Sequence, residues 1–81
     1  MFGLTACSST RTLELRTDPP GAKIYLNGLD SGTSPRLITF DFGTYRYNVV
    51  QLVSPGYKVN WNVYALENLP EDEYMTITLS R

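Results

Sequence analysis

Apolar and polar residues alternate with a period of two through most of the chain, which is the pattern of half-buried β-strands. In the run TLELRT, for example, Leu13 and Leu15 alternate with Glu14 and Arg16. No stretch of useful length has the 3.6-residue period of an amphipathic helix. The alternation predicts six short strands, at residues 12–17, 22–26, 36–40, 44–53, 59–65 and 74–79.

Residues typical of turns separate these strands. DPPG, NG, DFG and SPGY follow the first, second, third and fourth strands, and both 29–35 and the polar run ENLPEDE are expected to be loops. Turns at such short intervals favour an all-β fold, a small antiparallel two-layer β-sandwich. The residues expected to shape its corners are Pro19, Gly21, Asn27, Gly28, Gly32, Pro35, Gly43 and Gly56.

The apolar side of each strand predicts the core. Its expected members are Leu13, Leu15, Ile24, Leu26, Ile38, Phe40, Tyr47, Val49, Val59, Trp61, Val63, Met75, Ile77 and Leu79. Trp61 is the largest, so Trp61→Ala is expected to unfold the domain, whereas Tyr25→Ala should leave the melting curve nearly unchanged. In the fourth strand the apolar parity changes after Val49, which predicts a bulge at 48–51 or burial of both faces.

Composition narrows the possible functions. The 81 residues suffice for one domain with a thin core, and 42% hydrophobic and 19% charged residues are typical of a globular protein. The net charge is −1 and the seven basic residues form no run, which argues against nucleic-acid binding. The chain has no histidine and one cysteine, so the usual general base and the usual zinc ligands are missing. We therefore expect no enzymatic activity, no cofactor and no metal site.

The acidic residues do not suggest a site. Glu67, Glu71, Asp72 and Glu73 lack the spacing of a calcium loop and are interpreted as a solvated loop. The aspartates at 18, 30 and 41 each fall in a turn, where an aspartate side chain bonds nearby backbone.

Tyrosines are the candidate binding residues. By strand parity Tyr25, Tyr64 and Tyr74 face away from the apolar side of their strands, and Tyr57 lies in a turn. Tyrosine is enriched at interfaces because it combines apolar area with a hydroxyl. The alternative is that these residues are simply good strand formers on the outer faces of a sandwich.

The chain starts with MFGLTACSST, which places the only cysteine behind small apolar residues. Leu4, Thr5, Ala6 and Cys7 resemble the lipobox of bacterial lipoproteins, in which the cysteine is lipidated and becomes the mature N-terminus. The upstream basic and apolar regions of such a signal are missing, so residues 1–11 are interpreted as a truncated lipobox and flexible tether, and 12–81 as the folded domain. The alternative is a chance match, with Cys7 a small hydrophobe.

The order and spacing of the turns resemble those of the PEGA domain, a small β-sandwich module of bacterial and archaeal surface proteins. The matching residues are Pro19, Gly21, Ala22, Ile24, Tyr25, Asn27, Gly28, Gly32, Thr33, Pro35, Gly43, Tyr45, Gly56 and Tyr57. The chain departs from the pattern at Pro20, which replaces a glutamate, and in an insertion at 65–75 that leaves the pairing of the last strand open.

Together these features predict a non-enzymatic lipoprotein module of the bacterial cell envelope, facing the periplasm or held at the outer membrane. The expected role is adhesive, architectural or partner-docking, the expected partner is an envelope protein or a cell-wall glycan, and the membrane contact is through the lipid anchor only. The oligomeric state stays open. The alternative function is a soluble intracellular accessory or regulatory module, of phage or plasmid origin, with an accidental lipobox match.

Overall fold

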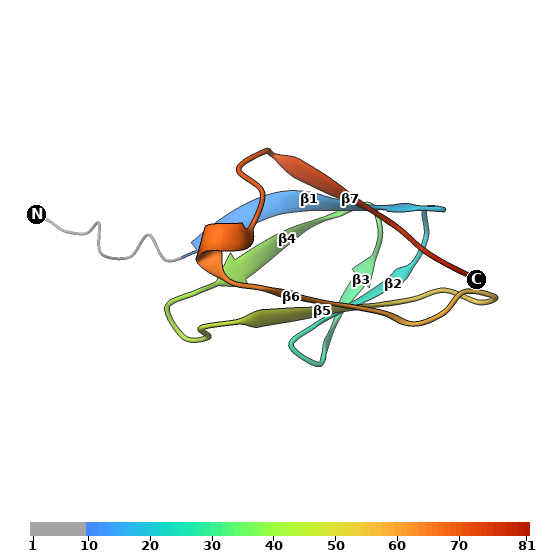
Figure 1. Ribbon diagram of the computed structural model, residues 1–81, viewed down its shortest axis with the longest axis horizontal. Helices are drawn as coiled ribbons and strands as arrows, with labels where there is room; N and C mark the ends of the chain where they lie inside the picture. Colours follow the sequence, from blue (N-terminus) through green and yellow to red (C-terminus); the bar gives the residue numbers. More distant parts are fainter. Residues whose placement is uncertain (1–9) are drawn as a thin grey trace, which may run out of the picture.

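A computed structural model describes residues 10–81 of the chain, and it is built almost entirely of β-strands (Figure 1). It has seven strands, where alternation predicts six, and one short 3-10 helix. The elements are β1 (Thr10–Asp18), β2 (Lys23–Leu26), β3 (Leu29–Thr33), β4 (Arg36–Asp41), β5 (Asn48–Val53), β6 (Asn60–Tyr64), the 3-10 helix η2 (Leu66–Asn68) and β7 (Tyr74–Thr78). Within residues 10–81, no helix has the length and apolar character needed to cross a membrane.

The strands form two sheets that pack as two layers, which confirms the predicted sandwich. Sheet A has the order β4-β1-β7, and sheet B has the order β3-β2-β5-β6. All pairings are antiparallel except β1 with β7, which is parallel and places Leu15 beside Met75. This parallel pair settles the position of the last strand, which the insertion at 65–75 had left open.

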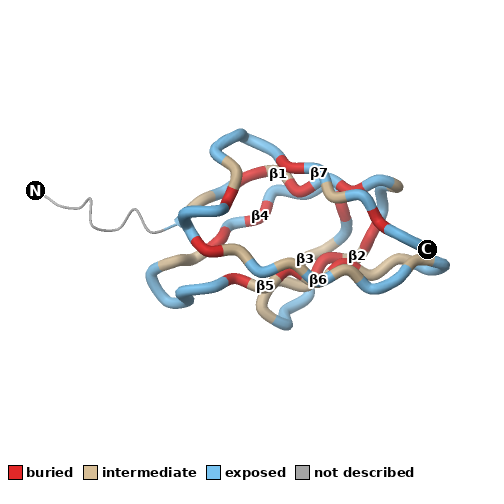
Figure 2. Tube along the Cα trace, in the orientation of Figure 1, coloured by how far each residue is buried: buried red, intermediate tan, exposed pale blue. Residues whose placement is uncertain are grey.

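The core lies between the two layers, where one face of each sheet is buried (Figure 2). Phe40 is fully buried and contacts two aromatic rings, stacking with Phe42 at 6.3 Å between centroids and meeting Tyr64 edge to face at 5.9 Å. The buried cluster consists of Leu13, Leu15, Ala22, Ile24, Ile38, Phe40, Val50, Leu52, Leu69, Met75 and Leu79.

Ser34 joins the two sheets at the corner between β3 and β4. Its buried hydroxyl lies 2.5 Å from the hydroxyl of Thr17 on sheet A and accepts a hydrogen bond from the backbone N–H of Ala22, just before β2, at 3.0 Å. The segment leading to this corner was expected to be a loop. Instead, residues 29–33 form β3, because the tight turn at Asn27 and Gly28 returns the chain along β2 as a hairpin.

β5 begins later than the alternation predicts. Residues 44–47 form a turn and bend, and the strand starts at Asn48, with Val50 and Leu52 pointing inward. The predicted bulge at 48–51 and the alternative of two buried faces are both wrong, because the change of parity marks the strand's start. Tyr47, expected in the core, is 54% exposed. The irregular register lies instead between Lys23 and Tyr25 in the β2–β3 pair.

A buried asparagine that the pattern did not predict fixes this start. Asn48 is completely buried; its Oδ1 accepts from Asn27 Nδ2 at 2.8 Å, and its Nδ2 donates to the Asp41 carbonyl at 3.0 Å. Asn27 Oδ1 accepts from the backbone N–H of Val49 at 2.8 Å. These bonds tie the β2–β3 turn to the first residues of β5.

The core prediction also fails along β6. Trp61 is 62% exposed and Val63 is 56% exposed, Val59 just before the strand is exposed, and Val49, their neighbour on β5, is only half-buried. The side chains that point inward are Asn60, Asn62 and Tyr64, which the period-two reading had assigned to the outside. The parity of this strand is therefore the opposite of the predicted one.

Candidate functional site

The outer face of sheet B carries exposed and half-buried side chains, most of them apolar, that are aligned across strands. In the pairing register Val49 lies opposite Val63, and Gln51 lies between Tyr25 and Trp61. Directly opposite side chains on one face of an antiparallel pair are 4.5–5.5 Å apart at Cβ, so these residues form a continuous surface. We call it the sheet B face; its residues are Tyr25, Val49, Gln51, Val53, Trp61 and Val63.

The inverted parity of β6 creates this face. Tyr64 packs edge to face on Phe40, and after it Ala65 and Leu69 are buried. The backbone N–H of Ala65 donates to Asn68 Oδ1 at 2.8 Å, which fixes η2 behind the strand. A shift of one residue would exchange the two faces of β6 and pull Tyr64 out of the core. Anchoring the strand's end therefore leaves Trp61 and Val63 in solvent.

The inward side of β6 is polar. Asn60 and Asn62 are half-buried, and their side-chain amides bond to each other, with Asn62 Nδ2 donating to Asn60 Oδ1. They lie beside Leu52 and Val50 of β5, at the edge of the core. The strand thus covers the core edge with amides and presents its large apolar side chains to solvent.

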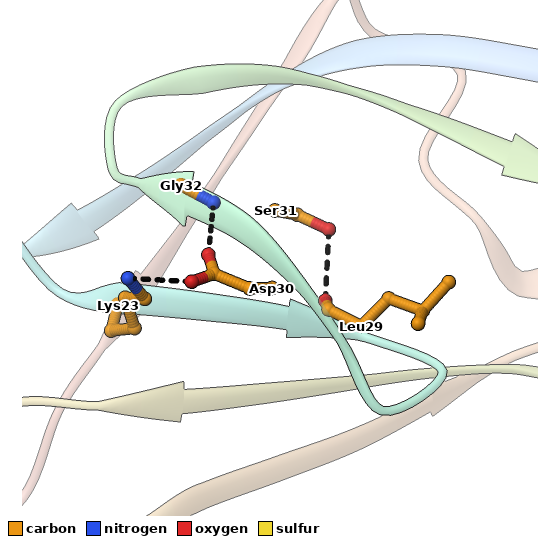
Figure 3. A network of polar contacts seen from close by, with 5 residues as sticks. All are labelled: Lys23, Leu29, Asp30, Ser31 and Gly32. Carbon is orange, nitrogen blue, oxygen red and sulfur yellow. Dashed lines mark hydrogen bonds and ion pairs between the residues drawn. The ribbon is translucent and has the colours of Figure 1, made fainter.

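One end of the sheet B face is bordered by charge (Figure 3). Lys23 Nζ and Asp30 Oδ2 form an ion pair at 2.8 Å, and Asp30 Oδ1 accepts from the backbone N–H of Gly32 at 3.0 Å. The hydrogen bond and charge of Lys23, with the Gly32 bond, lower the pKa of Asp30, and Asp30 raises the pKa of Lys23. In the same strand the Ser31 hydroxyl donates to the Leu29 carbonyl at 3.1 Å. The expectation that the aspartates at 18, 30 and 41 lie in turns is wrong, because Asp30 lies within β3 and the other two end β1 and β4.

The outer face of sheet A is polar by comparison. Arg16 Nε forms an ion pair with Glu14 at 2.6 Å, and the Arg16 guanidinium lies 4.0 Å above the ring of Tyr74. The hydroxyls of Thr12 and Thr39 lie 2.8 Å apart. Its exposed apolar residue, Leu37, sits on the edge strand β4 without an apolar neighbour opposite, because its partner across β1 is Glu14.

The four tyrosines expected to bind do not share one surface. Tyr25 lies on the sheet B face, and Tyr74 lies on the outer face of sheet A under Arg16. Tyr57 packs partly on the core, and its hydroxyl accepts from Arg81 at 3.2 Å. The expectation that Tyr64 faces outward is wrong, because its ring packs against Phe40, and this burial raises the pKa of its hydroxyl.

The corner residues take the following places. Pro19 and Pro35 each follow a cis peptide bond, Asn27 has a φ of 52°, and Gly43 donates its backbone N–H to Asp41 Oδ1. Gly32 lies inside β3, where a Cβ would come within 2.7 Å of the Arg36 side chain. The remaining turn glycines, Gly21, Gly28 and Gly56, have positive φ. Cys7 and the lipobox interpretation lie outside the described residues.

The Asp41 carboxylate accepts hydrogen bonds from the backbone of the turn that follows it. Asp41 Oδ1 accepts from the N–H groups of Thr44 at 3.0 Å and Gly43 at 2.9 Å, and the bonds from Thr44 and Gly43 lower its pKa. Within the described part of the chain no three metal-ligating side chains come together, and its surface has no pocket. The candidate site on this surface is the sheet B face, where Trp61 and Val63 are exposed.

Comparison with known families agrees with this architecture. The PEGA domain family model matches residues 10–79, nearly the whole described chain. The protein belongs to the PEGA domain family. Domains of this family are typically extracellular or periplasmic. No curated protein and no solved structure matches the chain.

Strand parity alone could not find the sheet B face of this PEGA domain. Of its six residues, only Tyr25 was predicted to be an exposed binding residue, and Val49, Trp61 and Val63 were placed in the core. The sequence does signal that the facing of this strand is ambiguous. In the run VNWNVY, one parity buries the ring of Trp61 and the other buries the ring of Tyr64. Burial of Tyr64 in place of Trp61 is decided by Phe40, which is distant in sequence.

Proposed function

We propose that this PEGA domain is a non-enzymatic docking module of the bacterial cell envelope that binds a partner protein with the sheet B face. The observation that carries the proposal is the orientation of β6. Its tryptophan and valine face solvent, and its asparagines face the core edge. Exposed apolar surface of this kind is unfavourable in water, and contiguous patches of it mark interaction sites.

The composition of the face supports a protein partner. Tryptophan and tyrosine are the residues that most often dominate binding energy at protein interfaces, and here Trp61 and Tyr25 lie on either side of Gln51 in one row. The valines at 49, 53 and 63 add aliphatic area, and Lys23 and Asp30 supply a charged rim. An apolar centre with a polar rim is the usual anatomy of such an interface.

The non-enzymatic part of the proposal is supported by how the titratable groups are used. A general acid or base near neutral pH is most often a histidine, or a carboxyl with a raised pKa. The chain has no histidine. The pKa of Asp30 is lowered by its bond with Lys23 and by the backbone N–H of Gly32, and the pKa of Asp41 is lowered by the bonds from Thr44 and Gly43. Asp30 thus links β3 to Lys23 of β2, and Asp41 holds the turn that follows β4.

Site-specific photocrosslinking in intact cells tests the docking surface. A photoreactive amino acid replaces Trp61 or Val63 on the sheet B face, and the matched controls carry it at Leu37 or Thr76 on sheet A. We expect one discrete protein adduct from the sheet B positions, weakened by Tyr25→Ala, and none from the controls. Equal labelling from both sheets would contradict the proposal. Retention of the protein on purified peptidoglycan, lost with Trp61→Ala, would identify a cell-wall glycan as the partner instead.

We further propose that the domain is anchored by lipid on Cys7. The residues Leu4 to Cys7 support this proposal, and so does the path of the chain: β1 begins at the end of the sandwich where η2 lies, away from the C-terminus (Figure 1). Arg11 Nη2 donates to the Pro70 carbonyl at 2.7 Å at this end. An anchor that enters there leaves the sheet B face free to bind.

Metabolic labelling tests the anchor. Cells that express the gene with its upstream DNA are grown with radioactive palmitate, and Cys7→Ser serves as the control. We expect label on the wild-type protein alone. An unlabelled wild-type protein in the cytosol would overturn the anchor and favour the intracellular accessory module.

A further inference from the structure

β6 is an edge strand with an open side. Within residues 10–81 it pairs with β5 on one side and with no strand on the other. The N–H and C=O groups of alternate edge residues point away from the partner strand and can pair with another strand. Natural edge strands are usually protected by charge, proline, bulges or covering segments. The segment Asn60–Tyr64 has neither charge nor proline.

The other three edges offer less to a second strand. β3 has an irregular register and carries Asp30 in an ion pair, and β4 begins with Arg36 and ends with Asp41. β7 is uncharged, but its outward side chains are two threonines and a tyrosine whose ring already has a guanidinium on one face. Pairing along β6 therefore gains the most apolar contact.

We propose that two copies of this chain pair antiparallel along β6, about a twofold axis through Asn62, and so form one eight-stranded sheet. This register overlaps all five residues of the strand. It also keeps the two sheet B faces on the same side, because residues directly opposite each other must share a face. The proposal rests on the open edge and does not depend on the partner protein proposed above.

The residues of β6 are self-complementary in this register. Trp61 of each copy lies opposite Val63 of the other copy. The dimer thus has two pairs of an aromatic and a β-branched side chain, and such cross-strand pairs stabilise sheets. On the inner side the two Asn62 amides face each other, and an amide both donates and accepts hydrogen bonds. Just before the strand, the backbone N–H of Lys58 donates to the Ser80 carbonyl at 2.7 Å, so this contact with the C-terminal segment falls outside the five residues that would pair.

The pairing would also enlarge the surface used for docking. It places the Tyr25–Gln51–Trp61 rows of the two copies on one continuous face, with Trp61 and Val63 near the twofold axis. The contact involves one five-residue strand from each copy, so it belongs with small, weak interfaces. Two lipid-anchored copies on one membrane would be concentrated in a way that favours a weak dimer.

Sedimentation velocity over a concentration series tests the dimer. Wild-type protein should shift from monomer to dimer, and Asn62→Asp and Asn62→Lys should each weaken self-association by about tenfold, because like charges then face each other across the axis. An equimolar mixture of the two variants should dimerise again, since the opposed charges now attract. Thr76→Asp, at the centre of the β7 edge, is the matched control and should dimerise as wild type does.

Three results would overturn the proposal. The first is wild-type protein that stays monomeric at the concentration of an NMR sample, and the second is a loss of dimer with Thr76→Asp but not with Asn62→Asp. The third is a mixture of folded variants that does not associate. If Asn62→Lys does not fold, Asn62→Asp alone is decisive. This variant should form the dimer again when acid protonates the new carboxyl. If it stays monomeric at every pH, the proposed pairing is wrong. Photocrosslinking of the monomeric variant tests the docking face separately.

Discussion

Single polar side chains determine where the strands of this PEGA domain begin. Asn48 is the clearest example, because its amide is completely buried and each end has a partner. Buried polar groups are tolerated when they are hydrogen-bonded and are costly when a partner is removed. Asn48 therefore fixes the β5 register in a position where an apolar residue would be the usual choice.

Asn48→Ala should lower the free energy of unfolding by about 2 kcal/mol, because it leaves the Asn27 amide and the Asp41 carbonyl without their partner. Urea unfolding followed by circular dichroism measures this loss. Asn68→Ala, which removes one half-buried bond at η2, is the comparison and should cost less. An Asn48→Ala protein as stable as wild type would show that the amide network does not hold the strand.

Asp41 should make the stability depend on pH. Its pKa is lowered in the folded protein by the bonds from Thr44 and Gly43, from an ordinary value of 3.8. A lowered folded pKa contributes stability above the unfolded pKa, and that contribution is lost as the pH falls through the folded pKa. Wild type should therefore have a higher urea midpoint than Asp41→Asn at pH 7, and the difference should vanish in strong acid. A difference that does not change with pH would contradict this assignment.

At the scale of the strands, the period-two pattern predicts the element order well and the facing of some strands poorly. β1, β2, β4 and β7 bury the side that alternation indicates, because in each of them most aliphatic residues share one parity; Leu37 of β4 is the exception and is exposed. β6 has apolar or aromatic residues on both parities, so local pattern cannot choose between them. The choice is made by Phe40, whose ring contacts Tyr64 across the layers. β3 was missed because Leu29–Thr33 is short and polar, and its strand conformation comes from the hairpin.

Because Trp61 faces solvent, the expectation from the sequence that Trp61→Ala unfolds the domain is replaced by the opposite one. Trp61→Ala should change the free energy of unfolding by only about 0.5 kcal/mol, because the side chain is mostly in solvent. Phe40→Ala should cost about 3–5 kcal/mol, because it empties the centre of the core. Thermal melts of the two variants measure the contrast, with Tyr25→Ala as a second surface control. Similar losses for Trp61→Ala and Phe40→Ala would mean that Trp61 is buried.

At the scale of the whole molecule, the sandwich has two outer faces of different character. Sheet A shows an ion pair, threonines, the separate exposed Leu37 and a tyrosine beneath Arg16, whereas sheet B shows aligned valines, a tyrosine and an exposed tryptophan. β1 begins at the end of the sandwich where η2 lies (Figure 1). This difference between the two outer faces is consistent with the proposed docking role, in which the sheet B face contacts the partner and the outer face of sheet A stays in solvent.

Quenching of tryptophan fluorescence by acrylamide tests the central claim most directly, because Trp61 is the only tryptophan of the chain. The measurement compares folded protein, diluted enough to be monomeric, with protein unfolded in urea. We expect Trp61 in the folded monomer to emit as tryptophan does in water and to be quenched nearly as efficiently as in the unfolded chain. A blue-shifted emission that acrylamide hardly quenches would place Trp61 in the core and contradict the account of β6.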